Sequence, residues 1–210
     1  MYLHKTSSLL KKMFSHYEWD VPNTHNTIYL TFDDGPIPIV TPWVLQILKE
    51  YNAKATFFGV GENVVRYPEI FAKILEQGHI VGNHTFNHMD GWRCSAQDYL
   101  SNIEKCQKAI SLKTAEGIKL FRPPYGRINR KASRKIANDF KIVMWDVLSA
   151  DYDTKLMPEQ CLKKTIKATI SGSIVLFHDS LKARNNLQYV LPKYLEHFSK
   201  LGYNFDLLPW

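Results

Sequence analysis

Two pairs of residues in this sequence have the types and the spacing that metal chemistry requires. The first pair, Asp33 and Asp34, follows an apolar run in the stretch YLTFDDGP. Adjacent carboxylates repel each other, so the pair costs stability unless a positive group lies nearby. The second pair, His84 and His88, stands four residues apart in HTFNH, a spacing that lets two imidazoles on a turn of helix bind one ion.

A divalent metal ion would account for both pairs at once. The two histidines and one of the aspartates make three ligands and leave a coordination position open for water, as catalytic zinc-type sites require. The charge of the ion offsets the repulsion between Asp33 and Asp34, so the aspartate outside the coordination shell can stay ionised and act as a base. Each motif alone also fits an ordinary turn. Their common position at the ends of predicted strands favours the metal site.

Polar side chains follow most of the predicted strands at the point where each strand ends. In a parallel α/β fold the carboxyl ends of the strands form one face, where loops assemble active sites. Residues more than a hundred positions apart are therefore expected to meet there. In chain order these residues are Asp33 and Asp34, His84 and His88, Arg122, Asp151, and His178.

The elements that must position these side chains alternate along the chain from Thr27 onward. Short apolar runs alternate with segments of helical spacing, which is the pattern of a parallel sheet covered by helices. The predicted strands are residues 27–32, 53–60, 79–83, 118–121, 141–147, 173–177 and 203–208. The predicted helices are residues 41–52, 68–78, 95–115, 129–138, 158–170 and 187–201. Seven strands in this order predict a single-domain α/β fold, a distorted (β/α)7 TIM-like barrel.

Residues 1–26 precede this pattern and are expected to form an N-terminal extension that packs on the barrel, with residues 27–210 as the catalytic domain. Leu9, Leu10, Met13 and Phe14 lie near two lysines in the extension. We interpret these apolar residues as packing against the domain. A short amphipathic anchor at a membrane surface is the alternative.

Composition excludes several classes of protein. The 210 residues are 45% hydrophobic and 22% charged, as in ordinary globular proteins. The net charge of +7 comes from basic residues scattered as singles and pairs, which favours a solvated surface over nucleic-acid binding. Three widely spaced cysteines without a CxxC pattern argue against a disulfide framework and a zinc–thiolate site.

The expected location of the protein rests on a search for a signal peptide and for transmembrane helices. No apolar run reaches the length of a signal peptide or of a transmembrane helix, so the chain as given is expected to be cytoplasmic. A leader missing upstream of the start is the alternative. The sequence gives no indication of the oligomeric state.

Five motifs together resemble the polysaccharide deacetylases, the family-four carbohydrate esterases, across residues 27–208. They are TFDDGP at 31–36, HTFNH at 84–88, RPPYG at 122–126, DY at 151–152 and LFH at 176–178. The resemblance implies that Asp33 is the general base and that Asp34, His84 and His88 hold the metal. It also implies that Arg122 pairs with Asp33.

The remaining family roles concern the substrate. The resemblance implies that the Tyr125 N–H binds the oxyanion, that Asp151 orients His178 as general acid, and that Leu176 lines a pocket for the acetyl methyl. The fourth motif departs from the family pattern DxxDW. The chain reads LSADY, with Leu148 in place of the first Asp and Tyr152 in place of Trp. This change affects the expected shape of the substrate groove more than the chemistry.

These roles predict a hydrolase that uses one divalent metal ion to remove N-acetyl, or O-acetyl, groups from a glycan containing N-acetylhexosamine. An Asp with two His suits zinc, with cobalt or nickel as alternatives. The expected partner is a glycan or an acetylated amino sugar, with no nucleic acid and no transmembrane segment. Two other functions stay open, namely hydrolysis of a small non-sugar amide and a non-catalytic glycan-binding barrel.

Overall fold

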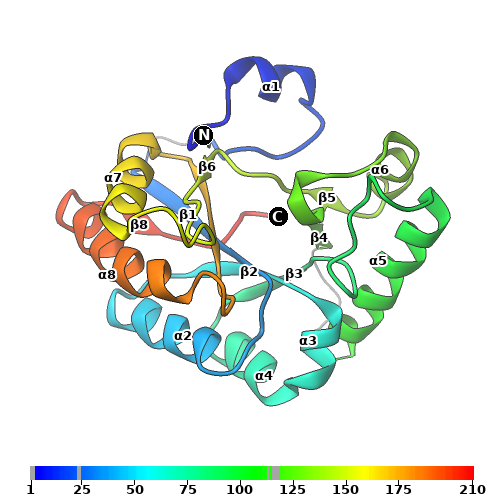
Figure 1. The fold of residues 1–210 in the computed structure, drawn as a ribbon, viewed down its shortest axis with the longest axis horizontal. Helices are drawn as coiled ribbons and strands as arrows, with labels where there is room; N and C mark the ends of the chain where they lie inside the picture. Colours follow the sequence, from blue (N-terminus) through cyan, green and yellow to red (C-terminus); the bar gives the residue numbers. More distant parts are fainter. Residues whose placement is uncertain (1–2, 23–24, 113, 115–118) are drawn as a thin grey trace.

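The computed structural model describes residues 3–22, 25–112, 114 and 119–210. Its centre is a curled sheet in which all paired strands run parallel, in the order β5-β4-β3-β2-β1-β7-β6, with β8 beside β1. Helices cover its outer side (Figure 1). The predicted α/β, TIM-like single-domain fold is therefore confirmed. The strands are β1 Thr27–Asp33, β2 Ala55–Gly59, β3 Ile80–Asn83, β4 Leu120–Phe121, β5 Lys141–Ile142, β6 Val147–Leu148, β7 Ile174–His178 and β8 Asn204–Phe205.

The helices alternate with the strands as expected, with two additions. The short helices α1 and α3 were not predicted, and α3 directly precedes α4, so two helices connect β2 to β3. The helices are α1 Ser8–Met13, α2 Val40–Glu50, α3 Gly61–Arg66, α4 Pro68–Glu76, α5 Ala96–Ser111, α6 Arg130–Ile136, α7 Pro158–Ala168 and α8 Arg184–Lys200.

Several predicted elements were wrong in extent, including strand 203–208, of which only Asn204–Phe205 forms β8. Helix α2 begins at Val40, before the expected cap Thr41, whose hydroxyl instead donates to Asp179. The predicted strand 141–147 is two strands, β5 and β6, which pair with different neighbours. Helix α5 ends at Ser111, and part of the remainder predicted to 115 lies outside the described residues.

The main core lies between the sheet and its helices. Phe32 of β1 stacks between Phe57 of β2 and Phe177 of β7, with ring centroids 5.1 and 5.8 Å apart. Because side chains alternate along a strand, the neighbours of Phe32 in β1, Thr31 and Asp33, face the inside of the curled sheet. Strands of a parallel sheet that is buried on both faces are expected to be continuously apolar. Polar residues in β1 therefore indicate a functional role.

The N-terminal extension fills the seam between β5 and β6, the two ends of the sheet. The Glu18 N–H donates to the Ile142 carbonyl at 2.9 Å, and the Met144 N–H donates to the Glu18 carbonyl at 2.7 Å. On the other side of the seam, the Leu148 N–H donates to the His4 carbonyl at 3.0 Å. The extension thus supplies partners for both exposed strand edges, which otherwise would carry unpaired backbone groups.

Buried charge fixes the extension in place. Asp146, buried between β5 and β6, accepts hydrogen bonds from Lys5 and Lys11 at 2.5 Å each and from Ser173 at 2.6 Å. Removing either partner of such a buried pair is strongly destabilising. The apolar side chains of α1, in contrast, do not pack on the domain: no residue of α1 is buried. Our interpretation as packing residues was therefore wrong for Leu9, Leu10 and Met13, whereas Phe14, just after α1, stacks on Tyr17.

Candidate active site

A buried ion pair stands at the end of β1. Asp33 is buried, and its Oδ1 accepts a hydrogen bond from Arg122 Nη1 at 2.8 Å. The same guanidinium nitrogen donates to the Thr31 hydroxyl, while Nε and Nη2 donate to the carbonyls of Val143 and Met144. With both ends of its fork engaged, Arg122 cannot rotate away. Asp33 is thereby held in one orientation with Oδ2 free.

Asp34 lies with the two histidines of HTFNH. Its Oδ1 is 3.3 Å from His88 Nε2 and 3.9 Å from His84 Nε2, and one ligand atom from each of the three residues lies within 4.8 Å of the other two. Asp33 Oδ2 is also 3.7 Å from His84 Nε2. The backbone of Asp34 is left-handed, with φ at +85°, and its carbonyl accepts from the Asn63 side chain at 2.7 Å.

The sequence predicts the two histidines on a helical turn. In the structure they lie in a loop after β3. Thr85 and His88 have φ of +63° and +57°, which the right-handed α-helix does not permit. The loop is held from α5, because the Asn102 side chain accepts from the Phe86 N–H at 2.7 Å. The Thr85 hydroxyl also accepts from the Met89 N–H at 2.9 Å. The two imidazoles thus face Asp34 through loop geometry.

Hydrogen bonding fixes the protonation of His84. Its Nδ1 is 2.8 Å from the Arg122 carbonyl, which can only accept, so Nδ1 carries the hydrogen and Nε2 presents a lone pair. Burial, against the charge of Asp33, lowers the pKa of His84 to about 4, so the ring is neutral at pH 7. A neutral Nε2 and two carboxylate oxygens then converge as acceptors, and a cation fits this donor set.

Asp34 is ionised in this arrangement. Burial acts to raise the pKa of Asp34, but the hydrogen bond from His88 and the charge of His178 hold it well below its ordinary value. A carboxylate that keeps its charge beside two imidazoles is the ligand type that zinc-like ions take.

Asp151 and His178 form a second ion pair across the site. Asp151 is fully buried, and its two oxygens accept from the His178 Nδ1–H at 2.8 Å and from the His178 backbone N–H at 2.9 Å. Burial opposes the charge of His178, but Asp151, with smaller contributions from Asp34 and Asp33, raises its pKa to about 9. The ring is therefore charged at neutral pH, with Nε2–H as its free proton.

Three predicted substrate-side residues lie around this pair of clusters. The Tyr125 hydroxyl is 3.2 Å from His88 Nδ1, and Tyr125 sits in a tight turn with φ of +59°. Tyr152 packs edge-on against His178, with ring centroids 4.9 Å apart. Leu176 is buried in register with Thr31, two residues before His178 and so on the same face of β7.

Our sequence reasoning missed Asp179. This fully buried carboxylate accepts from the Gly35 N–H at 3.0 Å and from the Thr41 hydroxyl at 2.6 Å, so it fixes the turn after Asp34. A Cβ on Gly35 would stand 2.0 Å from Asp179 Oδ2, which explains why the DDGP turn needs glycine. The position of Asp179 directly after His178 was the sequence signal that could have identified it. Burial raises the pKa of Asp179 to about 8.

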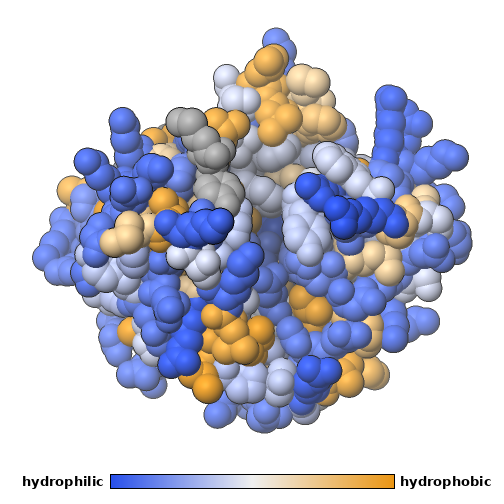
Figure 2. Space-filling view, viewed as in Figure 1, coloured by the Kyte–Doolittle hydropathy of each residue, from blue (hydrophilic) through white to orange (hydrophobic). Residues whose placement is uncertain are grey.

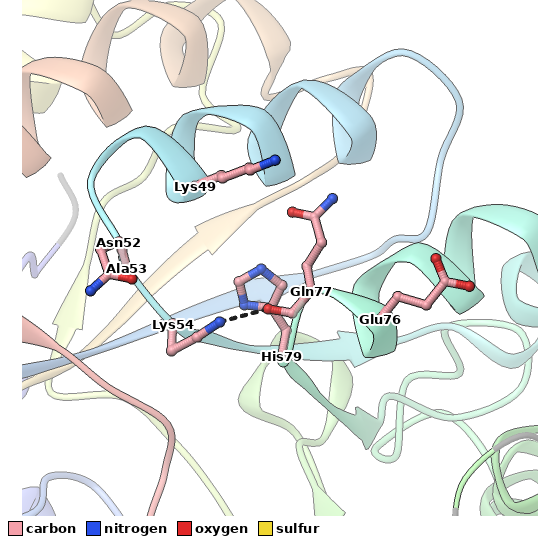
Figure 3. Close-up of a pocket in the computed structure, with 7 residues that line it drawn as sticks. All are labelled: Lys49, Asn52, Ala53, Lys54, Glu76, Gln77 and His79. Carbon is pink, nitrogen blue, oxygen red and sulfur yellow. Dashed lines mark hydrogen bonds between the residues drawn. The ribbon is translucent and has the colours of Figure 1, made fainter.

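A separate pocket lies at the other end of the sheet (Figure 3). It has a volume of about 310 Å³ and is lined by residues around Lys54 and His79, where the Lys54 ammonium donates to the Gln77 carbonyl at 2.6 Å. These residues precede β2 and β3, whereas the clusters described above follow the strands. In parallel α/β folds the chemistry lies at the carboxyl ends, so this pocket is not part of the candidate site.

Comparisons with known proteins agree with this geometry. A family model described as polysaccharide deacetylase matches residues 20–145. A peptidoglycan-N-acetylglucosamine deacetylase of Bacillus cereus is 37% identical over 190 residues, which are 89% of this chain and 88% of that protein. A peptidoglycan-N-acetylglucosamine deacetylase of Listeria monocytogenes, PgdA, is 38% identical over 156 residues, 74% of this chain. The match spans only 33% of the length of PgdA.

Among solved structures, a similar one is the Bc1960 peptidoglycan N-acetylglucosamine deacetylase in complex with 4-naphthalen-1-yl-N-oxidanyl-benzamide. It superposes with a TM-score of 0.86 and 30% sequence identity, covering 92% of this chain and 91% of that one.

Proposed function

Because the chain belongs to the polysaccharide deacetylase family, we propose that it is a metal-dependent hydrolase that removes N-acetyl groups from N-acetylglucosamine residues of a glycan. Peptidoglycan is the first candidate substrate, since the relatives described above are named for it. One observation carries the proposal. An arginine-held carboxylate, a cluster of three metal-type ligands and a charged histidine meet at the carboxyl ends of the strands.

Asp34, His84 and His88 would hold the ion, with zinc as the first candidate and cobalt or nickel as alternatives. When bound, a divalent cation supplies Lewis acidity toward the acetyl carbonyl and lowers the pKa of water in its coordination sphere. The tautomer of His84 supports this role, because its Nδ1–H is engaged by the Arg122 carbonyl and its Nε2 is directed at Asp34.

Asp33 is proposed as the general base. Arg122 occupies Oδ1 and leaves Oδ2, on the side of His84, as the atom that takes the proton from attacking water. Arg122 also prevents Asp33 from turning into the ligand cluster, because both carbonyl contacts of the guanidinium fix the fork. The base thus keeps its position while its charge changes.

His178 is proposed as the general acid. Its Nδ1–H is bound by Asp151, so the proton delivered to the departing amine comes from Nε2. With a pKa of about 9, this proton is present at neutral pH, and a buried histidine without its carboxylate would not hold it. Tyr152 packs edge-on against the ring and limits its rotation.

The acetyl group itself would be bound by residues of two strands. The Tyr125 N–H, in a turn whose prolines stiffen it, would donate to the oxygen on which negative charge develops. Leu176, on the same face of β7 as His178, would contact the methyl group. Leu148 and Tyr152 would border the sugar groove, where the chain differs from the family pattern.

Acetate release tests the proposal. Protein stripped with EDTA and reloaded with zinc, cobalt or nickel is incubated with peptidoglycan fragments, N-acetylglucosamine oligomers, O-acetylated sugars and small N-acetyl amides. We expect release from the N-acetylated glycans, abolished by stripping and by Asp33→Asn. Asp153→Asn, which removes the same charge near the site, serves as the control and keeps its activity.

The other functions give different results. Release of acetate from small amides alone would show that the substrate is not a glycan. Glycan binding without release by the metal-loaded protein would make it a non-catalytic barrel. Absence of both release and binding, with metal bound, would refute the proposed substrate class.

A further inference from the structure

The tip of α1 exposes an apolar surface. Leu9 and Met13 are 68% and 65% exposed, and Leu10 and Phe14, next to them in the chain, are also exposed. We call these four residues the α1 tip. Figure 2 shows apolar side chains gathered where α1 projects from the edge of the molecule. Gathered apolar side chains of this kind mark interaction sites, whereas single exposed apolar residues are ordinary.

Ion pairs and hydrogen bonds hold the backbone of α1 in place. Lys11, in the middle of α1, pairs with the buried Asp146 and with Asp20. The Ser7 side chain caps the helix by accepting from the Leu10 N–H at 3.2 Å. The Trp19 indole N–H donates to the Phe14 carbonyl at 2.9 Å. The apolar side chains are therefore presented outward by a fixed backbone and are not the frayed end of a chain.

A basic face lies next to the tip. Helix α6 exposes four cations, and none of them has an ion pair among the described residues. They are Arg130, Lys131, Arg134 and Lys135. Residues 119–138 contain no Asp or Glu, and neither do residues 3–17. We call these four residues the α6 basic face.

Direct contacts join the end of α1 to α6. Phe14 of the tip stacks on Tyr17, with ring centroids 5.9 Å apart and the rings 2° from parallel. The Tyr17 hydroxyl is in turn 2.8 Å from the Ser133 hydroxyl of α6. Figure 1 shows α1 and α6 at neighbouring positions on one side of the barrel. The α1 tip and the α6 basic face thus lie on neighbouring elements that are linked through Tyr17, which contacts the buried Ser133 of α6.

We propose that the α1 tip and the α6 basic face together dock the protein on an anionic lipid bilayer. The apolar side chains would enter the boundary between headgroups and acyl chains, and the α6 cations would bind the headgroup phosphates. A nucleic acid would satisfy the cations but would leave Leu9 and Met13 without an apolar partner. A symmetric dimer through the tip would bring two α6 basic faces toward each other, which like charges oppose.

Vesicle sedimentation tests the proposal without reference to catalysis. The full chain is mixed with phosphatidylcholine vesicles that contain, or lack, phosphatidylglycerol. We expect binding only to the anionic vesicles and weaker binding as salt increases. Leu9→Ser with Met13→Ser should reduce the partition coefficient at least about tenfold, and Lys131→Gln with Lys135→Gln at least about fivefold.

Matched variants control for lost hydrophobicity and lost charge. Val65→Ser with Ile170→Ser removes two apolar side chains that are 60% and 59% exposed elsewhere, and Lys49→Gln with Lys73→Gln removes two exposed cations of α2 and α4. Both controls should bind as the original chain does. No binding, equal binding to neutral vesicles, or equal loss in test and control variants would overturn the proposal. So would a concentration-dependent dimer in solution that Leu9→Ser with Met13→Ser abolishes.

Discussion

Replacing Asp151 with Asn should change the pH range in which the enzyme works. Asp151 accepts two hydrogen bonds from His178, one from the ring Nδ1–H and one from the backbone N–H. Asn keeps the size of the side chain but has one acceptor oxygen and no charge. It can satisfy only one of the two donors, and it no longer stabilises the charged ring.

The magnitude follows from the pKa of His178. Its value of about 9, against an ordinary 6.5, corresponds to about 3 kcal/mol in favour of the charged ring. Without the carboxylate, burial remains, so the pKa should fall to 6.5 or below. At pH 8 the protonated fraction then drops from nine-tenths to a few hundredths, and general-acid catalysis should fall about 30-fold.

The assay is the pH dependence of kcat/KM for acetate release, which reports groups of the free enzyme. The basic limb of the original chain should lie near pH 9, and that of Asp151→Asn at least about two units lower. Asp153→Asn removes the same charge two residues away and should leave the limb in place. A basic limb that is unchanged in Asp151→Asn would refute the idea that this carboxylate keeps His178 charged.

Stability should show the same linkage. The pKa of His178 is raised on folding, so its contribution of about 3 kcal/mol is fully present below pH 6.5 and is lost as the pH rises toward 9. The free energy of unfolding from urea titrations at pH 6 and pH 9 should therefore differ less in Asp151→Asn than in the original chain. An equal difference in both proteins would contradict this assignment.

Three further predictions concern other residues in and around the site. Arg122→Lys should lower the free energy of unfolding by about 3 kcal/mol, because the buried Asp33 loses its forked partner; an unchanged urea midpoint would contradict this. Asp34→Asn should weaken zinc binding at least about tenfold in calorimetry on stripped protein, and an unaltered affinity would remove Asp34 from the ligand set. Gly35→Ala should cost about 1–3 kcal/mol of stability, since its Cβ meets Asp179 at 2.0 Å; thermal unfolding without a change in Tm would show that the turn adapts.

The fold was predictable because the periodicity of the apolar residues and the order of the elements along the chain determine it. Strand β1 is buried on both faces and reads as a continuous run, and Pro68 marks the start of α4 as expected. The predicted strand 141–147 failed because its apolar pattern does not show a change of partner. Only the extension, inserted at Val143 and Val147, separates β5 from β6.

The candidate site was predictable where the chemistry uses charged residues at strand ends. Asp33 and Asp34 in one turn, with His84 and His88 in another, were enough to predict the cluster. The spacing could not give the loop geometry, because the left-handed backbone at Thr85 and His88 depends on Asn102 of α5. Asp179 escaped notice for a similar reason, as its partners Gly35 and Thr41 lie far from it in sequence.

Arg122 connects the closing of the sheet to the orientation of Asp33. Two of its donors bind the carbonyls of Val143 and Met144, in the segment between β5 and β6, where the sheet does not close on itself. That segment is held by the extension, since the Met144 N–H donates to the Glu18 carbonyl and Asp146 binds Lys5 and Lys11. A guanidinium needs fixed acceptors to hold a buried carboxylate in one orientation. The extension is therefore part of what positions the proposed base, although none of its residues belongs to the cluster.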